Sequence, residues 1–211
     1  MLCRLGGVCK VWLYLRLLKR RSAVVVVVKV VERPLPKPSD EGYIEARLLE
    51  ALTEAKLAVE FLGRGLVRNA AGKAFQAWKA LLAALLRLEL DKLKAIAKTE
   101  EERRWLESTA VPKISTTRMF SLSLMLEGLG YRGLSAWTER TLNIHDYQYH
   151  GPDPDMALSK YRSKEEAARA ILALAADVAE RAETLRGRVK WTDELEKALE
   201  ALRSSLSAVS I

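Results

Sequence analysis

Apolar side chains recur at intervals of three and four positions along most of the chain after Lys37, which is the spacing of a buried helix face. This pattern predicts one short and five long helices, over residues 40–62, 66–96, 99–105, 115–129, 133–150 and 163–185. A last helix follows Thr192. We therefore predict an all-α protein, built as an up-and-down helical bundle.

Polar residues mark several of the predicted helix starts. Thr99 with Glu102, and Ser163 with Glu166, have the spacing of a capping box, in which a side-chain oxygen accepts a hydrogen bond from a backbone N–H group of the first turn. Thr192 stands in the same position before the last helix. These residues fix where the short helix and the last two helices begin.

The helix predicted over residues 66–96 changes in side-chain size along its length. Its first half is small-sided, so a neighbouring helix can approach it closely there. The residues that form its apolar stripe are Ala70, Ala74, Ala77, Leu81, Leu85 and Leu88, with Phe75, Trp78 and Leu82 beside them. We expect it to be the central helix of the bundle.

The first 38 residues differ from the rest of the chain. Three alternate prolines, Pro34, Pro36 and Pro38, predict an extended linker, because each disfavours helix in the residue before it. Residues 23–31 contain five consecutive valines and favour a short strand, which needs a partner such as a second copy of the chain. Alternatively, residues 1–22 are an upstream extension of the domain. We predict a basic arm with a Pro-rich linker over residues 1–38 and a bundle domain over residues 39–211.

The net charge of +8 belongs to the arm. Residues 1–38 contain nine basic residues and one acidic residue, Glu32, so basic and acidic residues are equal in number over the rest of the chain. The body therefore lacks the basic excess of a non-specific DNA-coating protein. Cys3 and Cys9 have no second pair to complete a zinc site or a disulfide framework, so we expect a cytoplasmic protein without metal or other cofactor.

Three membrane-related interpretations concern the arm: a signal peptide, a membrane span and a helix on the membrane surface. The apolar run at residues 11–18 is interrupted by Arg16 and followed by Lys19, Arg20 and Arg21, which argues against a signal peptide. No run reaches the 18 to 20 apolar residues of a membrane span. A basic amphipathic helix lying on an anionic membrane surface stays open as an alternative.

The sharpest local signal is the pair of histidines, His145 and His150, in the helix predicted over residues 133–150. On that helix Arg140, Asn143, Tyr147 and His150 share an arc of about 80°, whereas His145 lies about 140° from Arg140 and borders the apolar face. The structural interpretation is that His145 is half-buried and satisfied by a neighbour. In that interpretation His150 caps the helix C-terminus.

The functional interpretation rests on spacing. Arg140, four intervening residues and His145, followed by Tyr147, resemble the R-x4-H signature, with its H-x-Y extension, of the HEPN superfamily (higher eukaryotes and prokaryotes nucleotide-binding domains). The resemblance implies a homodimeric helical bundle that cleaves RNA without metal in a cleft between protomers. Arg140 would stabilise phosphate charge, and His145 would move a proton with Tyr147 or Asn143 assisting. Thr141 stands where that superfamily commonly has Asn, Asp or His.

A second resemblance covers residues 40–185. The segment LVRNAAGKAFQAWKAL at residues 66–81, the segment AWTERTLNIHDYQY at residues 136–149 and GPDPD at residues 151–155 resemble the archaeal PaREP family of paralogous proteins, itself HEPN-like. This resemblance implies the helical fold more strongly than any activity.

Further charged residues offer weaker candidates. Arg68, Lys73 and Lys79 beside Trp78 suit contacts with RNA phosphates, with the alternative that Trp78 is core and the cations are solvated. Asp153 and Asp155 suit either a metal or, as we favour, turn chemistry.

Two functions follow from the sequence. The first is an RNA- or nucleotide-binding protein, a toxin-type ribonuclease in its sharpest form, with catalytic Arg140, His145 and Tyr147. Its expected partners are RNA or a nucleotide, a second copy of the chain and an antitoxin-like protein. The RNA-contacting residues in this interpretation are Asn143, His150, Arg68 and Lys73. The alternative is a non-catalytic homodimeric helical interaction module. Motifs of NTPases, dinucleotide-binding proteins and α/β-hydrolases are missing from the sequence.

Overall fold

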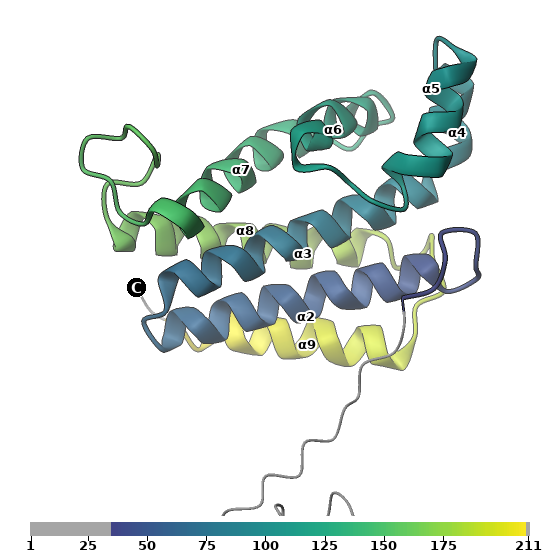
Figure 1. Ribbon diagram of the computed structural model, residues 1–211. Helices are drawn as coiled ribbons and strands as arrows, with labels where there is room; N and C mark the ends of the chain where they lie inside the picture. Colours follow the sequence, from purple (N-terminus) through teal and green to yellow (C-terminus); the bar gives the residue numbers. More distant parts are fainter. Residues whose placement is uncertain (1–34, 210–211) are drawn as a thin grey trace, which may run out of the picture. The chain divides into compact units, whose positions relative to one another are not determined.

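The computed structural model describes residues 35–209, and every regular element within them is helical (Figure 1). The all-α prediction is confirmed, whereas the strand predicted over residues 23–31 lies outside the described residues. The helices are α2 (Tyr43–Gly63), α3 (Val67–Leu88), α4 (Leu90–Ile96), α5 (Glu100–Trp105), α6 (Met119–Gly128), α7 (Leu134–His150), α8 (Lys164–Thr184) and α9 (Asp193–Ser207).

Helix α3 is central, as its apolar stripe predicts. It packs against α2, α6, α7 and α8, while α9 covers the other side of α2 (Figure 1). Its second half is apolar on nearly all sides, which is typical of a helix buried by several neighbours. The fully buried Trp78 donates a hydrogen bond from Nε1 to Thr138 Oγ1 of α7 at 2.9 Å, so even its polar atom is satisfied.

The small-sided first half of α3 receives α7. A β-carbon added at Gly72 would lie 2.9 Å from the side-chain nitrogen of Gln148, closer than van der Waals contact allows. The small residues of α3 therefore serve the packing of α7 within one chain.

The helix predicted over residues 66–96 ends earlier than expected, at Leu88. Glu89 leaves the helical conformation, with φ −102° and ψ 10°, and α4 begins directly after it. The Glu89 side chain is only 2% exposed and accepts hydrogen bonds from Tyr131 at 2.7 Å and from Arg188. No glycine or proline marks this break in the sequence. We attribute the break to the contacts of Glu89 with Tyr131 and Arg188, which are distant along the chain. Helix α6 also starts later than predicted, after a 3-10 turn at Thr116–Arg118.

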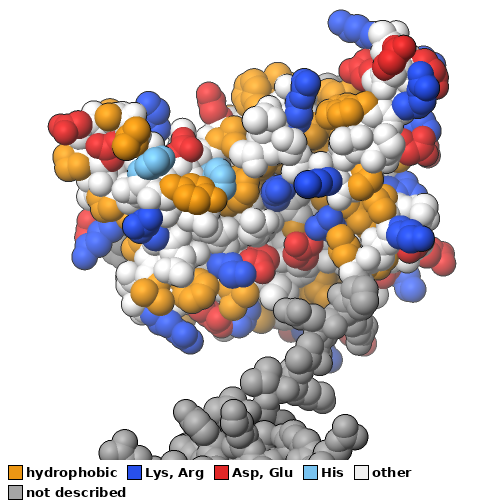
Figure 2. Space-filling model, in the orientation of Figure 1, with side chains coloured by type: hydrophobic (Ala, Val, Ile, Leu, Met, Phe, Trp, Pro, Cys, Tyr) orange, Lys and Arg blue, Asp and Glu red, His pale blue; other side chains and the backbone are white. Residues whose placement is uncertain are grey.

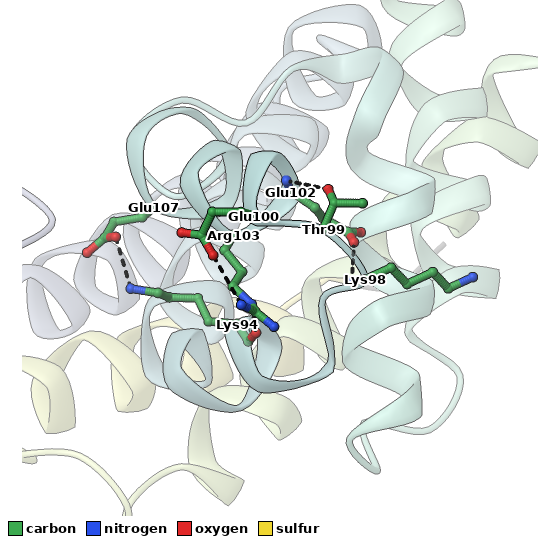
Figure 3. A network of polar contacts seen from close by, with 7 residues as sticks. All are labelled: Lys94, Lys98, Thr99, Glu100, Glu102, Arg103 and Glu107. Carbon is green, nitrogen blue, oxygen red and sulfur yellow. Dashed lines mark hydrogen bonds and ion pairs between the residues drawn. The ribbon is translucent and has the colours of Figure 1, made fainter.

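The short helices α4 and α5 form a corner held by polar contacts (Figure 3). Thr99 Oγ1 accepts a hydrogen bond from the N–H group of Glu102 at 3.1 Å, while the Glu102 carboxylate accepts one from the N–H group of Lys98 at 2.8 Å. The predicted cap is confirmed, as are those of Ser163 and Thr192. Lys94 pairs with Glu107 at 2.9 Å across the corner, a surface ion pair that contributes about 0–1 kcal/mol. None of the described helices is long and apolar enough to cross a lipid bilayer.

Candidate functional site

The candidate catalytic residues lie on α7, whose two ends are set by glycines. Gly133 and Gly151 both have φ of 72°, a conformation that favours glycine, and the N–H group of Gly151 closes the helix on Tyr147 O at 2.8 Å. The buried face of α7 is formed by Leu134, Thr138, Thr141, Ile144 and Tyr147. Arg140 directly precedes the buried Thr141, and His145 directly follows the buried Ile144. The two residues lie on opposite sides of the buried face.

Arg140 lies on the side of α7 that faces α8. Its guanidinium carbon is 4.5 Å from the centre of the Trp137 ring, a distance typical of a cation–π contact, and the side chain is exposed. Burial raises the pKa of Asp177 on α8, against the opposing effects of Arg181 and, more weakly, of Arg140. An exposed arginine in this position is accessible to an anionic ligand.

His145 lies on the side of α7 that faces α3. Its ring stacks on Phe75, with centroids 3.9 Å apart and planes 16° from parallel, and Tyr149 meets it edge-on at 5.1 Å. The histidine side chains, pale blue in Figure 2, lie on one face of the molecule beside hydrophobic side chains. Tyr149 is 60% exposed, so this face presents an aromatic ring next to the imidazole.

The environment of His145 favours the neutral imidazole. Burial lowers its pKa from the ordinary 6.5, and the charge of Lys79 acts in the same direction, while Gln148 and Asp146 oppose the shift. Nδ1 is buried and has no hydrogen-bond partner among the described residues. The prediction of a half-buried histidine is correct, but the expected partner of its buried nitrogen is not found there.

Within one chain, Arg140 and His145 have different neighbours. Arg140 contacts Trp137 and faces α8, whereas His145 contacts Phe75 and Tyr149 and faces α3. A cleft that uses both residues on one phosphate therefore needs a second copy of α7.

Tyr147 and Thr141 have structural surroundings. Tyr147 is 1% exposed and meets the Tyr161 ring edge-on at 5.9 Å; burial raises the pKa of its hydroxyl. The Thr141 hydroxyl donates to Trp137 O at 2.8 Å within the same helix. Thr141, which stands where the HEPN superfamily commonly has Asn, Asp or His, therefore faces the core.

Two of the candidate RNA contacts, Arg68 and Lys73, bind other groups of the same chain. Arg68 donates from Nε to Gln148 O at 2.9 Å and from Nη2 to Tyr149 O at 2.5 Å, so its charge lies at the C-terminus of α7. Lys73 forms an ion pair with Glu54 of α2 at 2.9 Å. Both cations connect helices of the bundle.

The remaining candidates differ in exposure. Asn143 is half-buried, and His150 is exposed at the end of α7. The Asp153 carboxylate accepts hydrogen bonds from the N–H groups of Leu158 and Ser159 at 2.6 and 3.0 Å, which favours turn chemistry. Among residues 35–209, no three His, Cys, Asp or Glu side chains are grouped as metal ligands.

Comparison with known proteins decides the family. The model of the archaeal PaREP1/PaREP8 family matches residues 46–172. The chain belongs to this family. Neither the curated proteins nor the solved structures gave a match.

The PaREP1/PaREP8 match begins inside α2, ends inside α8 and includes both Arg140 and His145. Sequence reasoning found these residues but missed the packing of His145 on Phe75. The spacing of Phe75 and Lys79, four positions apart on α3, predicts that these two side chains share a helix face but does not predict the contact with His145. Lys79 Nζ indeed lies 5.8 Å from the centre of the Phe75 ring.

Proposed function

We propose that this PaREP1/PaREP8 protein is a HEPN-like RNA-binding protein that cleaves RNA without metal, with His145 as the proton-transferring group. The observation that carries the proposal is the state of His145: a neutral, half-exposed imidazole with cationic Lys79 and exposed Tyr149 beside it. Nδ1 is buried without a partner among the described residues, so the proposal assigns the proton transfer to Nε2. A neutral imidazole is the form that accepts a proton.

The proposed reaction uses the ribose of the substrate as nucleophile. His145 takes the proton of the 2′-OH group, the 2′ oxygen attacks phosphorus, and the bond to the 5′ oxygen breaks. The products are a 2′,3′-cyclic phosphate and a 5′-hydroxyl end, the latter after gaining a proton. Arg140 from a second copy of the chain stabilises the negative charge on the phosphate.

Other residues of the face have supporting roles in this proposal. Tyr149 offers an exposed ring for base stacking, which contributes about 1–3 kcal/mol per base in single-stranded nucleic-acid binding. His150 and Asn143 contact the RNA nearby. Buried Tyr147 is a positioning residue, since its ring holds α7 against Tyr161.

The test is RNA cleavage by the wild type and by His145→Ala, with and without chelator. We expect metal-independent cleavage that yields 2′,3′-cyclic phosphate ends, and a loss of about 10²–10⁴-fold in rate on substitution, as for a proton-transferring group. Lys197→Ala, at an exposed position of α9 outside the proposed site, is the control and should keep most of the activity. A loss below tenfold in His145→Ala refutes the role of this residue.

A second candidate function is that of an interaction module. Phe120 and Leu124 of α6 lie four positions apart, a spacing that places them on one helix face, and they are 39% and 48% exposed. If these residues form a homodimer interface, sedimentation should show a dimer for the wild type and a monomer for Phe120→Asp/Leu124→Asp. A dimer that leaves RNA intact would favour this function over cleavage.

A further inference from the structure

A pocket of about 130 Å³ lies between α2, α3 and the segment that follows α5, away from Arg140. Side chains of all three segments line it: Arg47, Glu50, Gln76, Lys79, Pro112 and Lys113. Lysine and arginine side chains gather in the middle of the face shown in Figure 2, which also carries the histidines. The pocket therefore combines a concave shape with a concentration of positive charge.

The charges of this pocket are unbalanced. Glu50 is its single carboxylate and pairs with Arg47 at 2.8 Å. Lys79 and Lys113 make no ion pair within residues 35–209. Two cations without a counter-charge at a concave site favour an anionic ligand.

Arg47 is held in place before any ligand binds. Its Nε donates to the Tyr43 hydroxyl at 3.1 Å, and that buried hydroxyl donates in turn to Val111 O at 2.9 Å. A guanidinium has five N–H donors, and these bonds to Tyr43 and Glu50 leave further donors for a ligand. Burial lowers the pKa of Arg47, but the bonds to Tyr43 and Glu50 outweigh this effect, so Arg47 stays cationic.

Lys79 connects the pocket with His145. It lines the pocket, its Nζ lies 5.8 Å from the centre of the Phe75 ring, and Phe75 stacks on His145. A chain of phosphates that passes His145 would thus meet the pocket along α3.

We propose that this pocket is a second phosphate-binding site, which holds a phosphate of the RNA chain next to the cleavage site at His145. The ligand is a phosphate group bound by Arg47, Lys79 and Lys113, with the Gln76 amide as a further donor. The proposal rests on the proposed function for the nature of the chain. The pocket itself is argued only from its shape and charge.

The first experiment measures binding of a 2′-O-methyl oligonucleotide, which lacks the nucleophile and is not cleaved. We expect Lys113→Gln to weaken binding about tenfold and to lower the salt dependence by about 0.7 in the log–log slope, as for one lost phosphate contact. Lys197→Gln, at an exposed position of α9, removes the same charge from a residue that does not line the pocket and should change the affinity less than twofold. Equal affinity of Lys113→Gln and Lys197→Gln would overturn the proposal.

Comparison of the same oligonucleotide with and without a 5′-phosphate identifies the source of the phosphate. A gain in affinity from the 5′-phosphate that is lost in Lys113→Gln indicates a terminal phosphate. If the oligonucleotides with and without the 5′-phosphate bind equally well, and both bind more weakly to Lys113→Gln, the pocket holds an internal phosphate. Either result supports the site.

A second experiment separates failure of the pocket from failure of the RNA function. Inorganic pyrophosphate is titrated into the wild type and into Lys113→Gln while backbone amide resonances are followed. We expect saturable shifts at Gln76 and Ile114 in the wild type and at least tenfold weaker binding in the variant. Shifts without any RNA binding would keep the anion site and reject RNA as its ligand. No saturable shift, whether or not RNA binds, would overturn the site.

Discussion

At the scale of single residues, His145 is distinguished by a conflict between packing and solvation. Stacking on Phe75 places Nδ1 inside the protein, where it has no partner among the described residues. A buried polar atom without a hydrogen bond costs about 1–3 kcal/mol relative to a satisfied one. Perturbed titratable groups of this kind cluster at functional sites, although packing alone also produces them.

This conflict predicts a pH dependence of stability. Because folding lowers the pKa of His145 below 6.5, the unfolded chain binds the proton more readily than the folded one as the pH falls through that value. The free energy of unfolding should therefore decrease as the pH falls through 6.5, and level off below the folded-state pKa. The measurement is denaturant unfolding at several pH values.

His145→Gln is the comparison variant, since it lacks the titrating group. It should show a smaller decrease than the wild type over the same interval. Parallel curves for the two proteins would show that other groups cause the pH dependence.

At the scale of elements, the junction between α3 and α4 is decided by one carboxylate. Burial by itself raises the pKa of Glu89, but bonds from Lys92, Arg188 and Tyr131 outweigh this effect and lower the pKa to about 2. Desolvation and the bond to Glu89 raise the pKa of Tyr131 to about 12. Glu89 thus connects the α3–α4 junction with the segments before α7 and after α8.

Glu89→Gln is expected to destabilise the protein by about 1–3 kcal/mol, because it removes the charge that holds Arg188 and Lys92. The lowered pKa means that this stabilisation is present above about pH 4.5 and is lost as the pH falls toward 2. The difference in unfolding free energy between wild type and variant should therefore be largest at neutral pH. Glu107→Gln, in a surface pair with Lys94, serves as control with an effect of about 0–1 kcal/mol.

At the scale of the whole molecule, the core belongs to residues 35–209. Helix α3 contributes the largest buried side chain, Trp78, and α2, α7, α8 and α9 cover it with apolar faces. The net positive charge of the chain lies in residues 1–38, before the helices begin at Tyr43. Core and excess charge are thus carried by different parts of the sequence.

Deletion of residues 1–22 should accordingly leave the helical domain folded. We expect a melting temperature within a few degrees of the full chain and a retained helical circular dichroism spectrum, because the hydrophobic core is retained. If the arm contributes to RNA binding, its deletion lowers the salt dependence of binding without altering the melt. Loss of the cooperative transition would contradict the independence of the domain.

The amino-acid sequence by itself determined the class of fold and most helix ends, and it supplied the candidate site residues. These features are local: apolar spacing repeats within a few turns, and a cap such as Thr99 bonds to a residue three positions away. The sequence also predicted that another helix can approach closely at Gly72, because the size of each side chain is known from the sequence alone.

Only the tertiary structure decided which charged groups are engaged and where the central helix ends. Arg68 and Lys73 resemble solvated RNA contacts in the sequence, yet they bind the end of α7 and Glu54. The break at Glu89 depends on Arg188, which lies 99 positions further along the chain. Contacts between residues so far apart in sequence depend on how the helices pack, and the pattern of residues along one helix does not predict them.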